Sequence, residues 1–158
     1  MKTYRVENEW QRAGVYYIRT RAMVYGFDLS LQGEFADDTK DSEYILVTDD
    51  NDRPLSTNRI HLLPERGFAK IERVVTLEEA RGKGAGRAGI LAAEDWIRER
   101  GFKKIVITSR EEAVGFYEKL GYKAREDMST QTLEPKKPGE VIEVHDPRFI
   151  CVYTEKEL

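Results

Sequence analysis

Three glycines within five residues stand among basic residues near the middle of this 158-residue chain, in the run Arg81-Gly82-Lys83-Gly84-Ala85-Gly86. Glycines let a main chain turn tightly and approach a ligand closely, because no Cβ atom stands in the way. If a helix follows the run, its first amides have no internal partner and its dipole makes that end partly positive. With the charges of Arg81, Lys83 and Arg87 around them, these groups predict a cradle for phosphate.

A glycine-rich turn between a strand and a helix can also be only a turn, so the neighbouring elements must decide. Hydrophobic periodicity predicts helices over residues 11–25, 31–36, 84–100 and 111–120. Apolar runs predict strands over residues 3–6, 44–47, 55–63, 69–76, 104–108, 122–128, 141–144 and 148–153. Hairpins followed by crossovers through helices indicate an α/β fold with a mixed sheet and helices on its faces. The glycine run falls between a strand and the longest helix.

The length of the chain fits one domain, which we place at residues 1–158. No apolar run approaches the roughly 18 residues that span a bilayer, and the first residues lack the apolar core of a signal peptide. We therefore expect a cytoplasmic protein with no membrane partner. The net charge of -3 argues against nucleic acid as a partner, because nucleic-acid binders carry a basic excess.

Few residues of the chain suit a metal or a thiol reaction. It has one cysteine, Cys151, and two histidines, His61 and His145. This set offers neither a metal cluster nor an internal disulfide, so we expect no metal. The apolar neighbours of Cys151 predict a buried strand residue rather than a reactive thiol. We assign no role to His61 or His145.

Other phosphate-binding loops fit the glycine run less well. A P-loop needs a hydroxyl residue after its lysine, and Lys83 is followed by Gly84. A Rossmann pattern is formally present at Gly84, Gly86 and Gly89, and Arg110 could then read an NADP phosphate. However, eight residues separate the predicted strand from Gly84, and the chain is too short for two mononucleotide-binding halves. An NADP-binding reductase stays a remote alternative.

Two stretches together resemble a known family. Residues 71–86 are similar to motif A of the GNAT superfamily of acetyl-CoA-dependent N-acetyltransferases, whose core Arg/Gln-x-x-Gly-x-Gly/Ala is matched by Arg81, Gly84 and Gly86. Residues 113–122 are similar to its motif B, Ala-x-x-Phe-Tyr-x-x-x-Gly-Phe. Residues 21–28 weakly resemble the ElaA-like branch. The resemblance covers about residues 69–124 and implies an open mixed sheet of about six or seven strands with helices on both faces.

The resemblance implies acetyl-CoA as co-substrate. In this family the strand of motif A pairs its backbone with the pantetheine arm, and the amides that follow hold the pyrophosphate. Arg110 stands where relatives often have an asparagine that contacts the cofactor; it could reach a phosphate or lie in solvent. The cofactor-binding residues implied are Val74, Val75, Thr76, Arg81, Gly82, Lys83, Gly84, Ala85, Gly86, Arg87 and Arg110.

Two residues are candidates for catalysis, the first from the resemblance and the second from its place in the predicted strand. Tyr117 matches the position that protonates the departing CoA thiolate in many relatives, and a phenol with a usual pKa of about 10 keeps its proton at neutral pH. Core packing is its alternative role. An amine acceptor must lose a proton before it attacks, and Glu72 is the candidate base, because strand alternation places it on the same face as Val74 and Thr76. An exposed glutamate without function is the alternative there.

The acceptor is predicted only as a class, a primary amine of a small molecule or peptide. In the family, the acceptor groove lies between the first helices and the last hairpin. Acidic residues in the first of these segments, residues 23–41, would attract a cationic amine, although a solvated acidic loop is the favoured alternative over residues Asp28, Glu34, Asp37, Asp38 and Asp41. A catalytically silent CoA-binding module is the second function, and a homodimer is left open.

Overall fold

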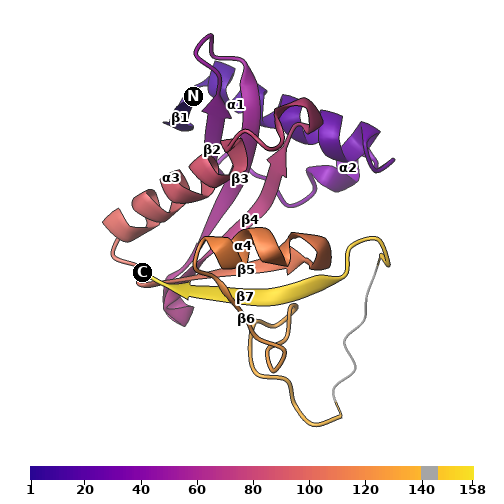
Figure 1. Cartoon of the computed structure of the whole chain (residues 1–158), viewed down its shortest axis with the longest axis vertical. Coiled ribbons are helices and arrows are strands. Elements are labelled where there is room, and N and C mark those ends of the chain that lie inside the picture. The colour runs from indigo at the N-terminus through magenta and orange to yellow at the C-terminus, as the bar shows by residue number, and fades with distance from the viewer. Residues whose placement is uncertain (140–145) are drawn as a thin grey trace.

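The computed structural model describes residues 1–139 and 146–158. Its centre is one seven-stranded sheet with the order β1-β2-β3-β4-β5-β7-β6 (Figure 1). Among the described strands, only the β4 and β5 pair is parallel, which confirms a mixed sheet and excludes the doubly wound parallel sheet of a dinucleotide reductase. The strands are β1 (Lys2–Arg5), β2 (Glu43–Thr48), β3 (Pro54–Leu63), β4 (Phe68–Thr76), β5 (Lys104–Arg110), β6 (Lys123–Ala124) and β7 (Cys151–Glu157).

Helices cover both faces of the sheet. On one face, α3 (Ala85–Glu99) and α4 (Val114–Lys119) pack over a core that includes Ile71 and Ile107. On the other face, α1 (Glu9–Arg19) packs through Val15 and Ile18 against Tyr44 and Leu46 of β2. The chain continues from α1 as the π-helix η1 (Thr20–Tyr25) and reaches the short α2 (Leu31–Glu34). Three short 3-10 turns are η2 (Pro64–Arg66), η3 (Glu78–Ala80) and η4 (Glu111–Ala113).

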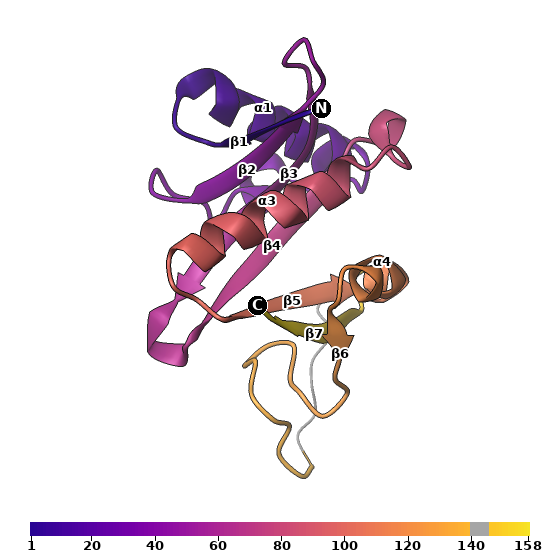
Figure 2. The same ribbon diagram turned by 60° about the vertical axis from the view of Figure 1, so that its left-hand side comes forward.

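The parallel strands β4 and β5 are paired at one end only. Their register joins Ala69 to Ile105 and Lys70 to Val106, and no later pair is formed between them in the described chain. Toward their carboxyl ends the two strands diverge, so that α3 and α4 stand beside the opening (Figure 2). The edge of β4 from Ile71 to Thr76 therefore faces β5 with main-chain groups that no neighbouring strand takes up.

A bulge in β4 changes which way its side chains point. Between the pairs Arg59 with Glu72 and Thr57 with Val75, β4 has one residue more than β3. Arg73 absorbs the extra residue with a φ of 52°, a left-handed conformation that is uncommon for a residue with a side chain. Alternation therefore breaks between Glu72 and Val74.

The predicted elements are found with a few shifted ends. The predicted helix 11–25 is an α-helix only as far as Arg19 and then widens into η1. The predicted strand 122–128 is reduced to two residues, and the last strand begins at Cys151 and runs on to Glu157. The predicted strand 141–144 lies outside the described residues. Within residues 1–139 and 146–158, the structure contains no helix of the length and apolarity that a bilayer crossing requires.

Candidate functional site

The glycine loop sits where three elements converge. Gly84 is the N-cap of α3 and has a φ of 87°, a conformation that glycine adopts without strain. A Cβ added to Gly86 would lie 3.2 Å from Oγ1 of Thr76 and 3.5 Å from the ring of Phe116, so β4, α3 and α4 meet at this point. Glycine at position 86 is what lets them approach.

Donors at this point are left without acceptors. No side chain caps α3, and the hydrogen bonds of the described residues leave the amides of Gly86 and Arg87 unpaired. Added Cβ atoms at Gly82 and Gly84 would meet nothing within 4 Å, so the loop is open on its outer side. Bare amides at the positive end of a fifteen-residue helix form an anion site.

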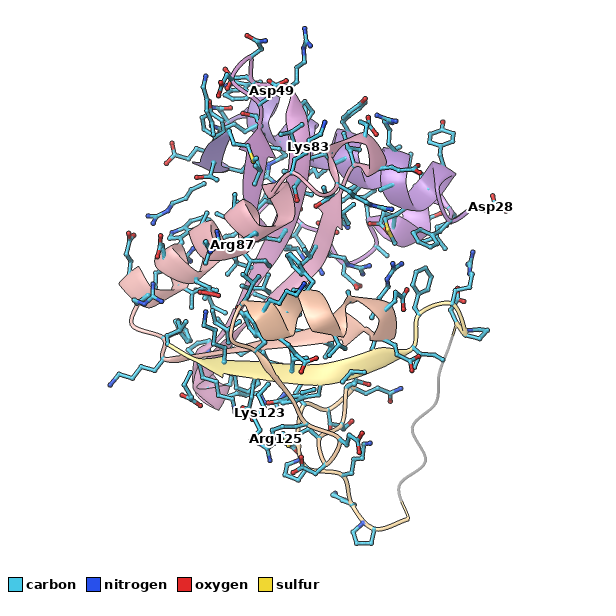
Figure 3. All side chains as sticks on the ribbon, in the orientation of Figure 1. Asp28, Asp49, Lys83, Arg87, Lys123 and Arg125 are labelled. Carbon is cyan, nitrogen blue, oxygen red and sulfur yellow. The ribbon has the colours of Figure 1, made fainter. Side chains whose placement is uncertain are left out.

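The cations around the loop are also unpaired. Arg81, Lys83 and Arg87 are exposed, and none takes part in an ion pair or side-chain hydrogen bond with the described part of the chain. Lys83 stands in the loop and Arg87 on the first turn of α3 (Figure 3). The structure thus brings together the residues that the sequence assigned to a phosphate cradle, and these residues fit a ligand with a pyrophosphate.

Tyr117 lies in the core between α4 and the sheet and is only 5% exposed. Its ring makes edge-on contacts with Phe116 and Tyr122, at centroid distances of 5.0 and 6.0 Å. Burial raises the pKa of the phenol above its usual value, while the charge of Arg110 acts against the rise. The raised pKa keeps the phenol protonated at neutral pH, and its hydroxyl forms no hydrogen bond with residues 1–139 or 146–158.

Glu72 does not share a face with Val74 and Thr76, and that part of the prediction is wrong. Val74 packs under α3 and Thr76 approaches Gly86 there, whereas Glu72 lies on the α1 side, where its Oε1 accepts a hydrogen bond of 3.0 Å from Nε of Arg59. The bulge at Arg73 causes the change of face. Glu72 remains at the β4 and β5 opening, but on the side opposite to α3.

A buried charge network lies behind Glu72. Arg59 also donates to Asp38, over 2.8 Å, and Asp38 in turn accepts from Arg19 and from the hydroxyl of Tyr44. Arg19 is fully buried and donates to the side chain and the carbonyl of Glu34. Burial alone would raise the pKa of Asp38, but the hydrogen bonds from Arg19 and Tyr44 outweigh it and lower the pKa to about 2.

The acidic segment is therefore only in part the solvated loop that its sequence suggests, because Asp28 and Asp41 are exposed and Glu34 and Asp38 are not. Glu34 and Asp38 are buried and matched by Arg19 and Arg59. Asp37 is exposed, but it pairs with Arg73 at 3.3 Å. Sequence reasoning missed Arg19 and Arg59, although a signal existed for the first. Arg19 follows Val15 by four residues and so lies on the apolar face of α1.

Arg110 is held by aromatic rings. Its guanidinium lies 5.0 Å from the ring of Phe27 and 5.8 Å from that of Phe149, and it pairs with Glu112 at 3.2 Å. None of these partners belongs to the glycine loop. The side chain of Arg110 is 35% exposed, and a contact of Arg110 with a cofactor stays a prediction.

The cysteine and the two histidines remain. Cys151 is exposed at the start of β7, opposite Arg110, so the prediction of a buried residue is wrong. The cause is the late start of β7, which leaves Cys151 at the strand end. His61 is 3.8 Å from Glu72 and largely exposed, and His145 lies outside the described residues. The described ranges hold no group of three metal-binding side chains.

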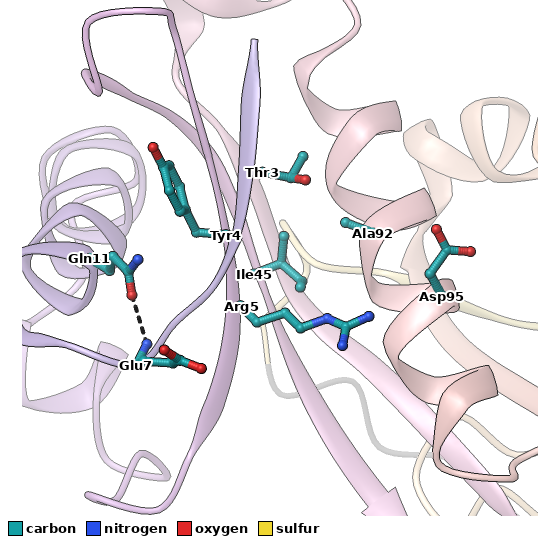
Figure 4. A pocket seen from close by; sticks show the side chains of 8 residues that line it. All are labelled: Thr3, Tyr4, Arg5, Glu7, Gln11, Ile45, Ala92 and Asp95. Carbon is teal, nitrogen blue, oxygen red and sulfur yellow. Dashed lines mark hydrogen bonds between the residues drawn. The ribbon is translucent and has the colours of Figure 1, made fainter.

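A recess of about 420 Å³ lies elsewhere, between β1, α1 and α3. Arg5 and Asp95 face it from opposite sides, and Gln11 accepts a hydrogen bond from the amide of Glu7 at its edge (Figure 4). Arg5 is already paired with Glu99 at 2.6 Å. This recess is separate from the glycine loop, and its charged side chains Arg5 and Asp95 are both paired within the protein, Asp95 with Arg98.

Comparison with known proteins gives the class. The family model described as acetyltransferase (GNAT) family matches residues 7–122, and the chain belongs to that family. An uncharacterized acetyltransferase of Streptococcus pyogenes serotype M1 is 37% identical over 89 residues, which are 56% of this chain and 61% of the relative. The chain thus spans little more than half the length of the curated relatives that it matches.

Solved structures share the whole fold. A protein of Lactobacillus plantarum assigned as an N-acetyltransferase has a TM-score of 0.79 and 27% identity, with 99% of this chain and 97% of that chain covered. ElaA of Escherichia coli has a TM-score of 0.73 at 18% identity, with 99% of both chains covered. The second likeness concerns the fold alone. The family assignment and the mixed open sheet with helices on both faces are confirmed.

Proposed function

We propose that this protein transfers an acetyl group from acetyl-CoA to a primary amine of a small molecule or peptide. The observation that carries the proposal is the set of unpaired donors at the start of α3. The amides of Gly86 and Arg87 and the side chains of Arg81, Lys83 and Arg87 surround one open loop. A pyrophosphate with two negative charges would satisfy them together.

The rest of the donor fits along β4. The main chain of Val74, Val75 and Thr76 faces the β4 and β5 opening without a strand partner on that side, and a pantetheine arm with its two amides would pair there as an added strand. Contact through the main chain leaves the side chains free to pack. Acetyl-CoA supplies the thioester, and the opening between the two strands would hold it.

Two side chains are assigned to proton transfer. Tyr117 would donate its proton to the CoA sulfur as the thiolate leaves, because burial keeps the phenol protonated at neutral pH. Glu72 would accept the proton that the amine must lose, from the α1 side of the opening. This side is also where an amine could enter without displacing the donor. Both roles are supported by position at the opening, and that of Tyr117 also by the family resemblance.

The test measures thiol release from acetyl-CoA against a panel of amines, with calorimetry for acetyl-CoA binding. Turnover with an amine, together with saturable acetyl-CoA binding, is the expected result. Tight binding without turnover on any amine would instead indicate a CoA-binding module. Absence of acetyl-CoA binding would remove the proposal altogether.

A further inference from the structure

A lysine stands where the two central strands part. Lys70 and its partner Val106 form the last pair between β4 and β5 before the strands separate. The side chain of Lys70 is 19% exposed, so it is partly enclosed and still reachable. A primary amine thus sits at the apex of the opening in which the acyl donor is proposed to bind.

Lys70 lies on the side from which an amine is expected to attack. Its neighbours Ala69 and Ile71 are buried in the core under α3, so alternation turns Lys70 to the α1 side, with Glu72. The charge of Lys70 also acts on the thiol of Cys151, where it opposes the rise in pKa that partial burial of the thiol causes. Lys70 thus stands at the point where the two strands separate.

The amine of Lys70 is held loosely. Its Nζ lies 3.6 Å from Oε2 of Glu72, and it has no hydrogen bond to any residue in the ranges that the structure describes. The other oxygen of Glu72 is occupied by Arg59. Lys156 differs, because its Nζ donates to Glu94 and to the carbonyl of Leu120. Lys70 can therefore reorient, and it has a carboxylate oxygen beside it.

We propose that Lys70 is a self-acetylation site of this protein, an inference that rests on the function proposed above. The ammonium of Lys70 gives a proton to Glu72, and the amine attacks the carbonyl carbon of acetyl-CoA. A carbon–nitrogen bond forms, the carbon–sulfur bond breaks, and the thiolate takes a proton from Tyr117. The balance is one acetyl-CoA and one lysine ammonium converted to acetyl-lysine, free CoA and one proton released to water.

The product changes the acceptor side of the site. An acetyl-lysine carries no charge, so Glu72 loses its neighbouring cation, and the added group occupies the apex of the opening. An amide is not cleaved by the same chemistry, so the modification occurs once per molecule. Transfer to external amines is then slowed as modified protein accumulates.

The experiment incubates the full chain with acetyl-CoA and no added amine, and follows each lysine by peptide mass spectrometry. Lys70 is expected to gain one acetyl group about tenfold faster than exposed Lys123, because a positioned amine reacts at a high effective concentration. Lys123 in the same sample reports the uncatalysed reaction. The rate at Lys70 should be independent of protein concentration, and Tyr117→Phe should slow it without changing the rate at Lys123.

A second variant links the modification to activity. Lys70→Arg keeps the positive charge beside Glu72 and removes the reactive amine, so it should not lose transferase activity during incubation with acetyl-CoA, whereas the unaltered protein should.

If external amines are acetylated but Lys70 reacts no faster than Lys123, this inference is wrong and the proposed function stands. If neither external amines nor Lys70 are acetylated, both are wrong. A rate that rises with protein concentration would assign the reaction to a second molecule and overturn self-acetylation.

Discussion

The glycine loop at the start of α3 and the charge network behind Glu72 both concentrate ionised groups, yet they differ in how those groups are paired. Around the loop, Arg81, Lys83 and Arg87 are exposed and have no partner in the described residues. In the network, Arg19 and Arg59 are buried and bonded to carboxylates at 2.6 to 3.0 Å. The two regions lie on opposite faces of one sheet.

This difference separates groups that await a ligand from groups that hold the protein together. An exposed cation without a partner stays hydrated when the protein folds, so folding costs it no desolvation free energy. It gains favourable electrostatic energy when an anion binds. A buried cation must be matched within the protein, since a charge left unpaired in the interior is costly. Substitutions in the loop should therefore change binding and leave stability alone, and substitutions of the buried arginines Arg19 and Arg59 in the network should do the reverse.

The largest effect is expected for Arg19→Met. The substitution leaves Glu34 and Asp38 buried without their cation, and breaking a buried ion pair in this way costs about 3 to 5 kcal/mol. Urea unfolding should show that loss in the free energy of unfolding. Arg21→Met is the matched control, because Arg21 is exposed and its pair with Glu79 lies in solvent, where such pairs add little. Equal losses in both variants would contradict the distinction between the regions.

Tyr117→Phe tests an unpaired group inside the core. The hydroxyl has no hydrogen bond within the described ranges, so its removal should leave the free energy of unfolding nearly unchanged. Loss of a proton donor should lower kcat by about 100-fold, within the range for general acid catalysis, with the Kd for acetyl-CoA preserved. Steady-state kinetics and calorimetry measure the two. Tyr122→Phe is the control, because its hydroxyl is bonded to Glu94, and there stability should fall while kcat is retained.

The cations of the loop are tested together in Arg81→Gln, Lys83→Gln and Arg87→Gln. The triple variant should raise the Kd for CoA by about 30-fold at low salt, because charge-assisted contacts to a pyrophosphate are lost. The difference from the unaltered protein should shrink as salt screens the charges. A variant with Lys123→Gln, an exposed cation on β6, should bind CoA normally. Unchanged affinity in the triple variant would show that the loop is only a turn.

The sequence reveals the first region far better than the second. The loop is contiguous, and its glycines and cations act through the main chain and through their own charge, so residues 81–87 can be recognised without any knowledge of tertiary contacts. The network joins Arg19, Glu34, Asp38 and Arg59 and ends at Glu72, and these residues come from four separate parts of the chain. Their pairing depends on how α1 and β3 pack, and no local pattern reports that.

The bulge in β4 is the clearest case of information that spacing does not carry. Strict alternation placed Glu72 on the face of Val74 and Thr76, and one extra residue at Arg73 reversed the outcome. A bulge at a non-glycine residue leaves no mark in the composition of a strand. The strands β3, β4 and β5 and the long helix α3 could be predicted, because their apolar patterns are long and glycine or proline stands at or near their ends.

Acid should weaken the network before it affects the loop, since the loop holds no carboxylate. The pKa of Asp38 in the folded protein is about 2, below the ordinary value of about 3.9. A lowered pKa means that the carboxylate stabilises the folded state fully above about pH 4, and that this stabilisation is lost as the pH falls toward 2. The free energies of unfolding of the unaltered protein and of Asp38→Asn, measured in urea, should therefore differ most at pH 5. At pH 2 this difference should be smaller by about 1 to 2 kcal/mol. Because both proteins share every other carboxylate, a difference that stays constant with pH would mean that Asp38 is not held ionised by Arg19 and Tyr44.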